Sequence, residues 1–154
     1  MSSEDKPLEF VPGREEAGVS RSLLIWLNTF PEIPLSIVKI DYEFMAAKSP
    51  CMALSLVQST YIVERFIDGA YTAEYQFKII YRLNPGSPDA RLSADELLDR
   101  LGEWADGQKP WIGDGLEVQE LEQAAPAALF ARMEDGWEDH QIFMRMTYQV
   151  KPGK

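Results

Sequence analysis

The chain has 154 residues, 45% of them hydrophobic and 26% charged, which is enough for one domain with a substantial core and too apolar for wholesale disorder. Its formal net charge of -10 argues against a general nucleic-acid binder, because such proteins use Lys and Arg to neutralise phosphates. The one cysteine forms no intramolecular disulfide, and neither a signal peptide nor an apolar stretch of roughly 18 residues is visible, so we expect a cytoplasmic product with no membrane partner.

The N-terminal residues 1–16 combine prolines, a glycine and many charges, which is typical of a flexible arm that orders only when a partner holds it. From Gly18 to Phe30 apolar residues recur at helical spacing, and Pro31 ends this first helix. We therefore expect an arm over residues 1–16 and a single domain over residues 17–154.

Four strands are predicted before the next helix, over residues 37–45, 51–57, 61–67 and 71–82. The fourth alternates most regularly, because the apolar side chains between Tyr71 and Tyr81 fall on one face and the polar ones on the other, with only Ile80 breaking the pattern. Asp68-Gly69 precedes it and favours a tight hairpin turn, since both residue types tolerate positive φ.

A proline-rich loop precedes the second helix, whose start is predicted at Ser93, where Ser93 and Glu96 match a capping box. Gly107 ends this helix. Three more strands are predicted over residues 116–121, 127–133 and 141–150, with a turn at Glu134-Asp135-Gly136 before the last. This order predicts an α+β domain with a mainly antiparallel sheet and two helices packed on one face.

Candidates for catalysis or metal binding are few. His140 is the only histidine and has no nucleophile beside it in sequence, so we expect an exposed or hydrogen-bonded residue at the end of a strand. Cys51 lies in an apolar run and is expected in the core. One histidine and one cysteine do not make a structural zinc site, and the acidic run 134–139 lacks the spacing of a calcium loop. We predict no enzyme activity, no cofactor and no metal.

The four tryptophans divide into two groups. Trp26 and Trp104 lie on the apolar faces of the two predicted helices, which favours core packing. Trp111 and Trp137 are flanked by loop residues and are the better candidates for exposed contacts.

Six segments spread from residue 40 to residue 141 resemble one protein family. They are IDYEF (40–44), SPCMALS (49–55), AEYQFKIIYR (73–82), RLSADELL (91–98), ALFAR (128–132) and EDHQ (138–141). These segments are similar to the minor capsid proteins of tailed phages and prophages of low-GC Gram-positive bacteria. The resemblance covers most of the chain after Gly18.

Such proteins resemble, in size and element order, the tail terminators and tail-completion proteins of long-tailed phages, which form a ring, commonly of six copies, at the head-proximal end of the tail. The resemblance implies a structural virion protein that caps the tail tube, stops its polymerisation and joins tail to head. The implied partners are further copies of the chain, the tail tube protein and neck or head-tail connector proteins, with genomic DNA only passing through an acidic lumen. The implied location is the host cytoplasm during assembly and then the head-tail junction of the virion.

Two turns are the candidate contact sites of such a ring. One is the tip of the central hairpin, and the other is the acidic turn before the last strand. Their residues are Asp68, Gly69, Ala70, Glu134, Asp135, Trp137, Glu138 and Asp139. An ordinary solvated turn explains each segment equally well.

Three other functions stay open at this point. The chain can be another neck component, such as a head-tail adaptor or stopper, a small regulatory or inhibitory binding protein, or a degenerate enzyme domain. A ring protein should assemble with itself or with a tube, whereas an inhibitor should form a stoichiometric complex with one host protein. An enzyme should lose activity when His140 or Cys51 is replaced.

Overall fold

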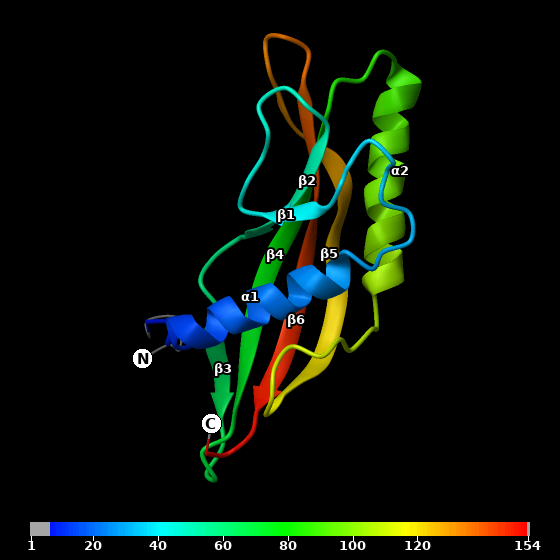
Figure 1. The fold of residues 1–154 in the computed structure, drawn as a ribbon. Helices are drawn as coiled ribbons and strands as arrows, with labels where there is room; N and C mark the ends of the chain where they lie inside the picture. Colours follow the sequence, from blue (N-terminus) through cyan, green and yellow to red (C-terminus); the bar gives the residue numbers. More distant parts are fainter. Residues whose placement is uncertain (1–6, 154) are drawn as a thin grey trace.

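The computed structural model describes residues 7–153, which form two helices and six strands (Figure 1). The elements are α1 (Gly13–Leu27), β1 (Ile40–Tyr42), β2 (Cys51–Leu56), β3 (Tyr61–Arg65), β4 (Tyr71–Leu83), α2 (Pro88–Ala105), β5 (Leu116–Arg132) and β6 (Glu138–Val150). This composition confirms the predicted α+β class. No helix formed by residues 7–153 is both long and apolar enough to cross a membrane.

The six strands form one sheet in the order β1-β2-β4-β6-β5, with β3 also paired to β4. Only β1 and β2 are parallel, so the predicted antiparallel character of the sheet is confirmed. β4 is the central strand, because it pairs with β2, β3 and β6. Its pairing with β6 is unbroken from Tyr71 opposite Val150 to Leu83 opposite Glu138.

The alternation predicted for β4 is confirmed, since its apolar face is buried from Tyr71 to Ile79. β6 alternates in the same way, and the two buried faces join because Tyr75 lies opposite Met146 in the sheet. Buried leucines of both helices, including Leu23 and Leu101, belong to the same core cluster. Figure 1 shows α1 lying across the long strands and α2 running alongside them. The helices contact each other through Trp26 and Trp104, whose rings stack with centroids 4.5 Å apart.

Five of the six tyrosines have raised pKa values, namely Tyr61, Tyr71, Tyr75, Tyr81 and Tyr148. Burial is the main cause in each case, because it disfavours the charged phenolate. Burial together with a hydrogen bond to Glu74 raises the pKa of Tyr61 to about 12. At Tyr71 and Tyr148, hydrogen bonds to the carboxylate of Glu15 raise the pKa further.

These shifts predict alkaline unfolding. A raised pKa means that the folded chain keeps a proton that the unfolded chain loses near pH ~10, so the stabilisation is complete below that pH and is lost as the pH rises above it. We expect tyrosinate absorbance and loss of far-ultraviolet circular dichroism to develop together above pH ~10, whereas the chain in denaturant should titrate at pH ~10 with no such coupling. Full tyrosinate absorbance at pH ~10 with an unchanged dichroism spectrum would contradict this prediction.

The N-terminal region differs from the prediction. α1 begins at Gly13 instead of Gly18, with Glu15 and Glu16 in its first turn, where carboxylates interact favourably with the helix dipole. Just before α1, the backbone N–H of Ile62 donates to the carbonyl of Glu9 at 2.7 Å. Residues 9–11 therefore lie against β3 through an isolated bridge between Phe10 and Tyr61, a long-range pairing that composition does not reveal. Residues 1–6 of the predicted arm lie outside the described residues.

The start of α2 also differs, and the predicted capping box at Ser93 is wrong because Ser93 lies inside the helix. The N-cap is Ser87, whose hydroxyl accepts a hydrogen bond from the N–H of Ala90 at 3.2 Å, and Pro88 takes the first helical position. The predicted end is correct, since the helix stops at Ala105 and Gly107 adopts a positive φ of 78°.

Three strand boundaries are corrected by the structure. β1 is only three residues long, and its predicted continuation ends where Glu43 adopts a positive φ of 51°. Residues 116–132 form the single strand β5, in which several bulges carry the chain past Pro126. β6 begins at Glu138, three residues earlier than predicted, so the acidic turn is shorter than expected.

Candidate functional site

The tip of the β3–β4 hairpin projects beyond the rest of the sheet at one end of the molecule (Figure 1). The tip is closed by Phe66, whose N–H donates to the carbonyl of Ala70, and by Asp68, whose carboxylate accepts from the N–H of Ala70 at 3.0 Å. Gly69 has a φ of 93°, as such a turn requires. Of the predicted contact residues, Asp68 and Gly69 are exposed, but Ala70 is buried. Ile67, which the sequence reasoning did not select, is fully exposed at the tip.

The second predicted contact region lies at the opposite end of the sheet, between β5 and β6. Glu134 and Asp135 are exposed there, and Trp137 is half-buried. Glu138 and Asp139 are in β6 and are buried, so the prediction that the whole acidic run forms one exposed turn is wrong. Their burial has a physical reason, because both carboxylates are paired with arginines that are distant in sequence.

Glu138 is the centre of a buried ionic cluster. Its carboxylate accepts hydrogen bonds from Arg91 at 2.7 Å, from Arg132 at 3.0 Å and from His140 at 3.1 Å, while the other ring nitrogen of His140 contacts Asp95 at 2.7 Å. Burial acts to raise the pKa of Glu138, but these hydrogen bonds outweigh it and hold the pKa below its usual value. The cluster joins α2 to β5 and β6 at one end of the sheet.

A neighbouring ion pair extends this cluster to a loop. Arg82 holds Asp139 with two hydrogen bonds of 2.7 and 2.8 Å, a bidentate geometry that favours a fixed arrangement. Arg82 also donates to the carbonyl of Ala46 at 2.9 Å, which fastens the loop between β1 and β2 over the sheet. Cys51 contacts the same carbonyl at 3.9 Å, and burial raises the pKa of its thiol.

His140 and Cys51, the two residues considered for catalysis, both lie in hydrogen-bonded surroundings. His140 is only 1% exposed, and carboxylates contact both of its ring nitrogens, so it has the hydrogen-bonded role that was one of its two predicted alternatives. Cys51 is half-buried instead of fully buried, because it lies under the loop rather than in the main core. Among residues 7–153, no group of three or more His, Cys, Asp and Glu side chains is arranged to hold a metal ion.

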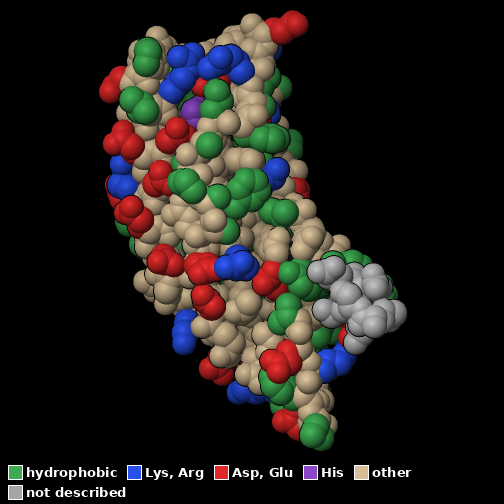
Figure 2. All heavy atoms as spheres, turned by 180° about the vertical axis from the view of Figure 1, so that it is seen from behind, with side chains coloured by type: hydrophobic (Ala, Val, Ile, Leu, Met, Phe, Trp, Pro, Cys, Tyr) green, Lys and Arg blue, Asp and Glu red, His purple; other side chains and the backbone are tan. Residues whose placement is uncertain are grey.

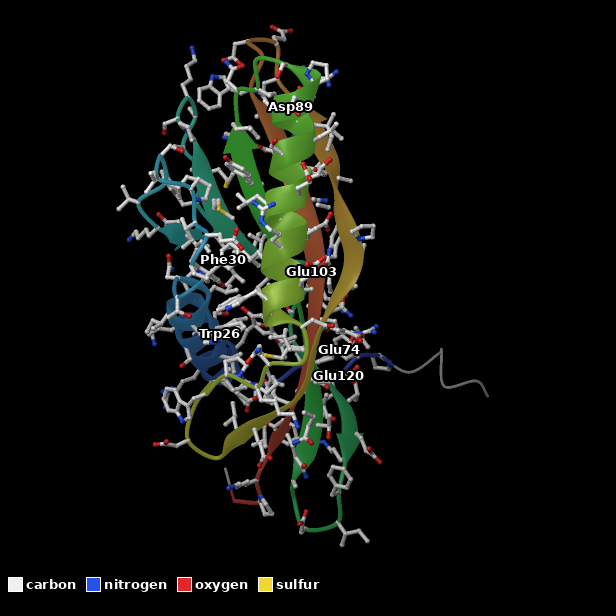
Figure 3. All side chains as sticks on the ribbon, turned by 90° about the vertical axis from the view of Figure 1, so that its right-hand side faces the viewer. Trp26, Phe30, Glu74, Asp89, Glu103 and Glu120 are labelled. Carbon is white, nitrogen blue, oxygen red and sulfur yellow. The ribbon has the colours of Figure 1, made fainter. Side chains whose placement is uncertain are left out.

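The sheet face turned away from α1 is open over much of its area, and Figure 2 shows an apolar area on it beside a band of charged side chains. Figure 3 places Glu74 and Glu120 on this side, away from Trp26 and Phe30. Tyr61 donates a hydrogen bond to Glu74 at 2.5 Å, which holds this carboxylate in place.

Two further contacts order the open face. Lys78 lies over the ring of Phe130, with its ammonium 5.0 Å from the ring centroid. Arg145 pairs with Glu122, which lowers the pKa of Glu122, whereas a hydrogen bond with Glu122 raises the pKa of Glu120. Glu74, Glu120 and Glu122 therefore share the open face with Lys78 and Arg145, so that side chains of both charges border its apolar area.

Both borders of the sheet are unsuited to pairing with another strand. β5 is an edge strand interrupted by bulges and by Pro126, and Glu117 and Glu120 are exposed on it. On the other side β3 is covered by residues 9–11, and β1 is only three residues long. These are the devices that proteins use against edge-to-edge association.

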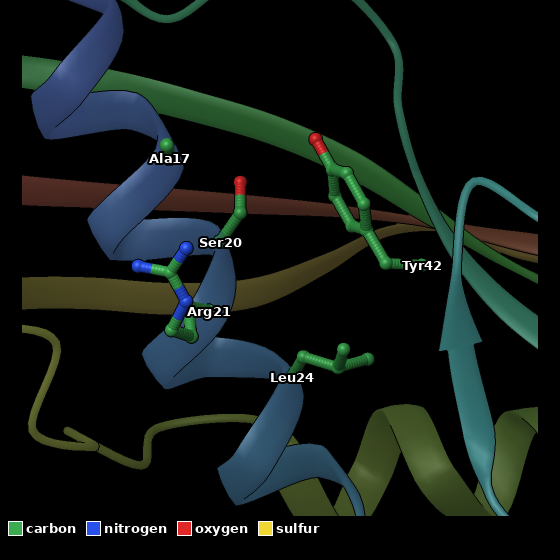
Figure 4. A pocket seen from close by; sticks show the side chains of 5 residues that line it. All are labelled: Ala17, Ser20, Arg21, Leu24 and Tyr42. Atoms are coloured by element: carbon green, nitrogen blue, oxygen red, sulfur yellow. The ribbon is translucent and has the colours of Figure 1, made fainter.

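A groove lies between α1 and β1, which we call the α1 groove (Figure 4). It is lined by Ala17, Ser20, Arg21, Leu24 and Tyr42 and encloses about 240 Å³. Ser20 and Tyr42 face each other across it in Figure 4, and the hydroxyl of Ser20 is hydrogen-bonded to Tyr75 at 2.7 Å in the floor. Arg21 is exposed at the rim and forms no ion pair with any residue that the structure describes.

Comparison with known proteins gives no family. No protein-family model matches the chain, and no curated protein matches it. Among the solved structures that resemble it, one matches over 88% of this chain and 92% of its own length, at 15% sequence identity and a TM-score of 0.40. A likeness of this strength carries no argument about function.

The four tryptophans differ in their burial. Trp26 and Trp104 are partly buried and stacked on each other at the edge of the core. Trp111 is exposed, as predicted, and Trp137 is half-buried. Two features of the surface escaped the sequence reasoning, namely Ile67 at the tip and the α1 groove. A signal for the first exists in the sequence, because Ile67 directly precedes the Asp68-Gly69 turn.

Proposed function

We propose that this chain is a structural protein of a phage virion, a tail terminator that forms a ring at the head-proximal end of the tail tube. The observation that carries the proposal is the distribution of surfaces on an elongated sheet. One end projects an apolar hairpin tip at Ile67, the opposite end carries the acidic pair Glu134 and Asp135, and an open face with an apolar area and a band of charged side chains lies between them. A ring subunit between a tube and a neck needs several different contact surfaces of this kind and no active site.

The resemblance to phage minor capsid proteins supports the same function. The six segments that carry it fall on β1, β2, β4, the first half of α2 and the adjoining parts of β5 and β6. They therefore include the central strand β4 and the residues of the ionic cluster, as well as surface residues. By this resemblance the ring has six copies and joins the tail to the head.

The shape of the sheet edges and the charge favour closed assembly. Heterologous contacts between identical subunits close into a ring when the rotation between neighbours is suitable, and the blocked edges prevent open-ended strand pairing. With a formal charge of -10 per copy, a ring can expose an acidic lumen through which DNA passes without adhering.

The test is a nonsense codon in this gene within the phage that encodes it, followed by negative-stain electron microscopy of the lysate. Detached full heads beside tails of irregular, excessive length are expected, because only a missing cap lets tail tubes overgrow. A copy of the gene supplied in trans should restore tail length. Normal-length tails beside unjoined heads would assign the protein to the neck instead, and intact infectious particles would contradict a structural role.

A further inference from the structure

The hairpin tip combines an apolar and an acidic side chain at one projecting point. Ile67 is fully exposed, Phe66 beside it is partly exposed, and Asp68 follows directly. One carboxylate oxygen of Asp68 accepts from the N–H of Ala70, which leaves the other oxygen free. An isoleucine held in water at the end of a rigid turn gains free energy when it is buried, roughly 1.5–3 kcal/mol for a full side chain.

The α1 groove has the complementary character. Its walls are mainly the apolar parts of Ala17, Leu24 and Tyr42, and its rim carries the exposed cation Arg21. Its volume of about 240 Å³ is below the range of roughly 300–1,000 Å³ that is usual for small-molecule sites. The groove therefore fits one or two protein side chains accompanied by a negative charge.

Charge distinguishes the hairpin tip from two other exposed apolar side chains, Val38 and Trp111. Val38 is fully exposed but directly precedes Lys39, and the exposed Trp111 follows Lys109 by two residues, so each would bring a cation toward Arg21. Ile67 is followed by Asp68, which would bring a carboxylate. Arg21 is exposed and forms no ion pair with any of residues 7–153, so an acidic group of another molecule can bind beside it.

We infer that the β3–β4 hairpin tip of one copy binds the α1 groove of the next copy, with Ile67 in the groove and Asp68 paired with Arg21. This inference rests on the proposed ring and names the contact that builds it. Figure 1 places the tip at one end of the molecule, and β1, which borders the α1 groove, on the far side of α1 from that tip. Because tip and groove are different, separate surfaces, the contact is heterologous, leaves one free tip and one free groove on any open chain, and ends only when a ring closes.

The first test exchanges the two charges in the full-length chain and follows self-association by analytical ultracentrifugation. Arg21→Glu and Asp68→Arg are each expected to weaken association about tenfold or more, because each places like charges together. The double variant restores opposite charges and should recover most of the affinity. Arg14→Glu, on the same exposed helix but outside the groove, is the matched control and should have little effect.

The apolar part of the contact is tested with one variant and one matched control variant. Ile67→Asp should abolish association, whereas Val38→Asp, at an equally exposed apolar position, should not. A chain with Cys51→Ala, Ile67→Cys and Leu24→Cys should give a ladder of covalent oligomers with a short bismaleimide, because each copy then offers one thiol at the tip and one in the groove.

The results of these experiments distinguish a failure of the tip-in-groove contact from a failure of the proposed function. Association that persists in Arg21→Glu, Asp68→Arg and Ile67→Asp, without cross-linking of the two thiols, would overturn the tip-in-groove contact and leave the ring in place. A wild-type chain that stays monomeric, alone and with the tail tube protein, would contradict both. If both single charge variants lose self-association and the double variant does not recover it, the proposed pairing of Asp68 with Arg21 would also be overturned.

Discussion

Replacing Arg91 and Arg132 together with methionine is expected to lower the free energy of unfolding by about 3–5 kcal/mol. Both guanidinium groups bind the carboxylate of Glu138, whose side chain is 1% exposed. Without them the carboxylate is left in the protein interior with only His140 as a partner, and an uncompensated buried charge is among the costliest single defects. Equilibrium denaturation in urea at neutral pH measures the loss.

Two variants test the reason for this effect. Glu138→Leu in the same background removes the buried charge and should recover most of the lost stability, because a well-packed apolar group can replace a buried ion pair. Arg145→Met is the matched control, since Arg145 pairs with Glu122 on the open face, where such pairs contribute little. An equal loss for Arg145→Met, or no recovery with Glu138→Leu, would show that burial of Glu138 is not the cause.

The pH dependence gives an independent check. In the wild-type chain the pKa of Glu138 lies below its usual 4.5, so its stabilisation is present above that pH and is lost as the pH falls through the lowered value. In the double methionine variant the two arginine hydrogen bonds are gone, so burial raises the pKa of Glu138. Acidification then protonates the carboxylate and removes the free-energy cost of a buried, unpaired charge. The stability difference between the two chains should therefore shrink as the pH falls toward 4.5.

Glu15→Ala is expected to cost about 2–4 kcal/mol, because this carboxylate accepts hydrogen bonds from two buried tyrosine hydroxyls, each of which would lose its partner. Tyr148 donates to one oxygen of Glu15 at 2.6 Å, and Tyr71 donates to the other. The three residues join the first turn of α1 to β4 and β6, the two longest-paired strands of the sheet. Thermal or urea unfolding of the single variant measures the cost.

A double-mutant design isolates the hydroxyls. In a chain with Tyr71→Phe and Tyr148→Phe, no donor remains for Glu15, so Glu15→Ala should then cost about 1 kcal/mol or less. If Glu15→Ala costs as much in that background as in the wild type, its effect arises from the helix terminus and not from the tyrosines.

The fold was largely predictable because its central strand follows one simple rule. In β4 every second residue faces the core. A strand with one buried face shows this alternation in its sequence whatever packs against that face. The tryptophans and the end of α2 at Gly107 followed from similarly local patterns. The start of α2 was missed because two serine caps compete in the sequence, and the one preceding proline, Ser87, prevailed.

The surface and the ionic cluster were harder to predict, for a different reason. In the sequence, Glu138 and Asp139 are typical of a solvated turn. In the fold they bind Arg91 and Arg82, which belong to elements tens of residues away. The α1 groove likewise joins α1 to Tyr42 of β1. A pattern within one segment cannot reveal contacts that only the tertiary fold creates.

The pairing of β4 with a strand much later in the sequence affects how the chain is made. One whole side of the central strand β4 is paired with β6, which is translated after the other five strands of the sheet. Until then the newly made chain carries apolar side chains such as Phe77 with half of their sheet missing, a state prone to aggregation and degradation. A translation stop anywhere before residue 138 should therefore leave no folded product, so early and late nonsense alleles are expected to produce the same null phenotype.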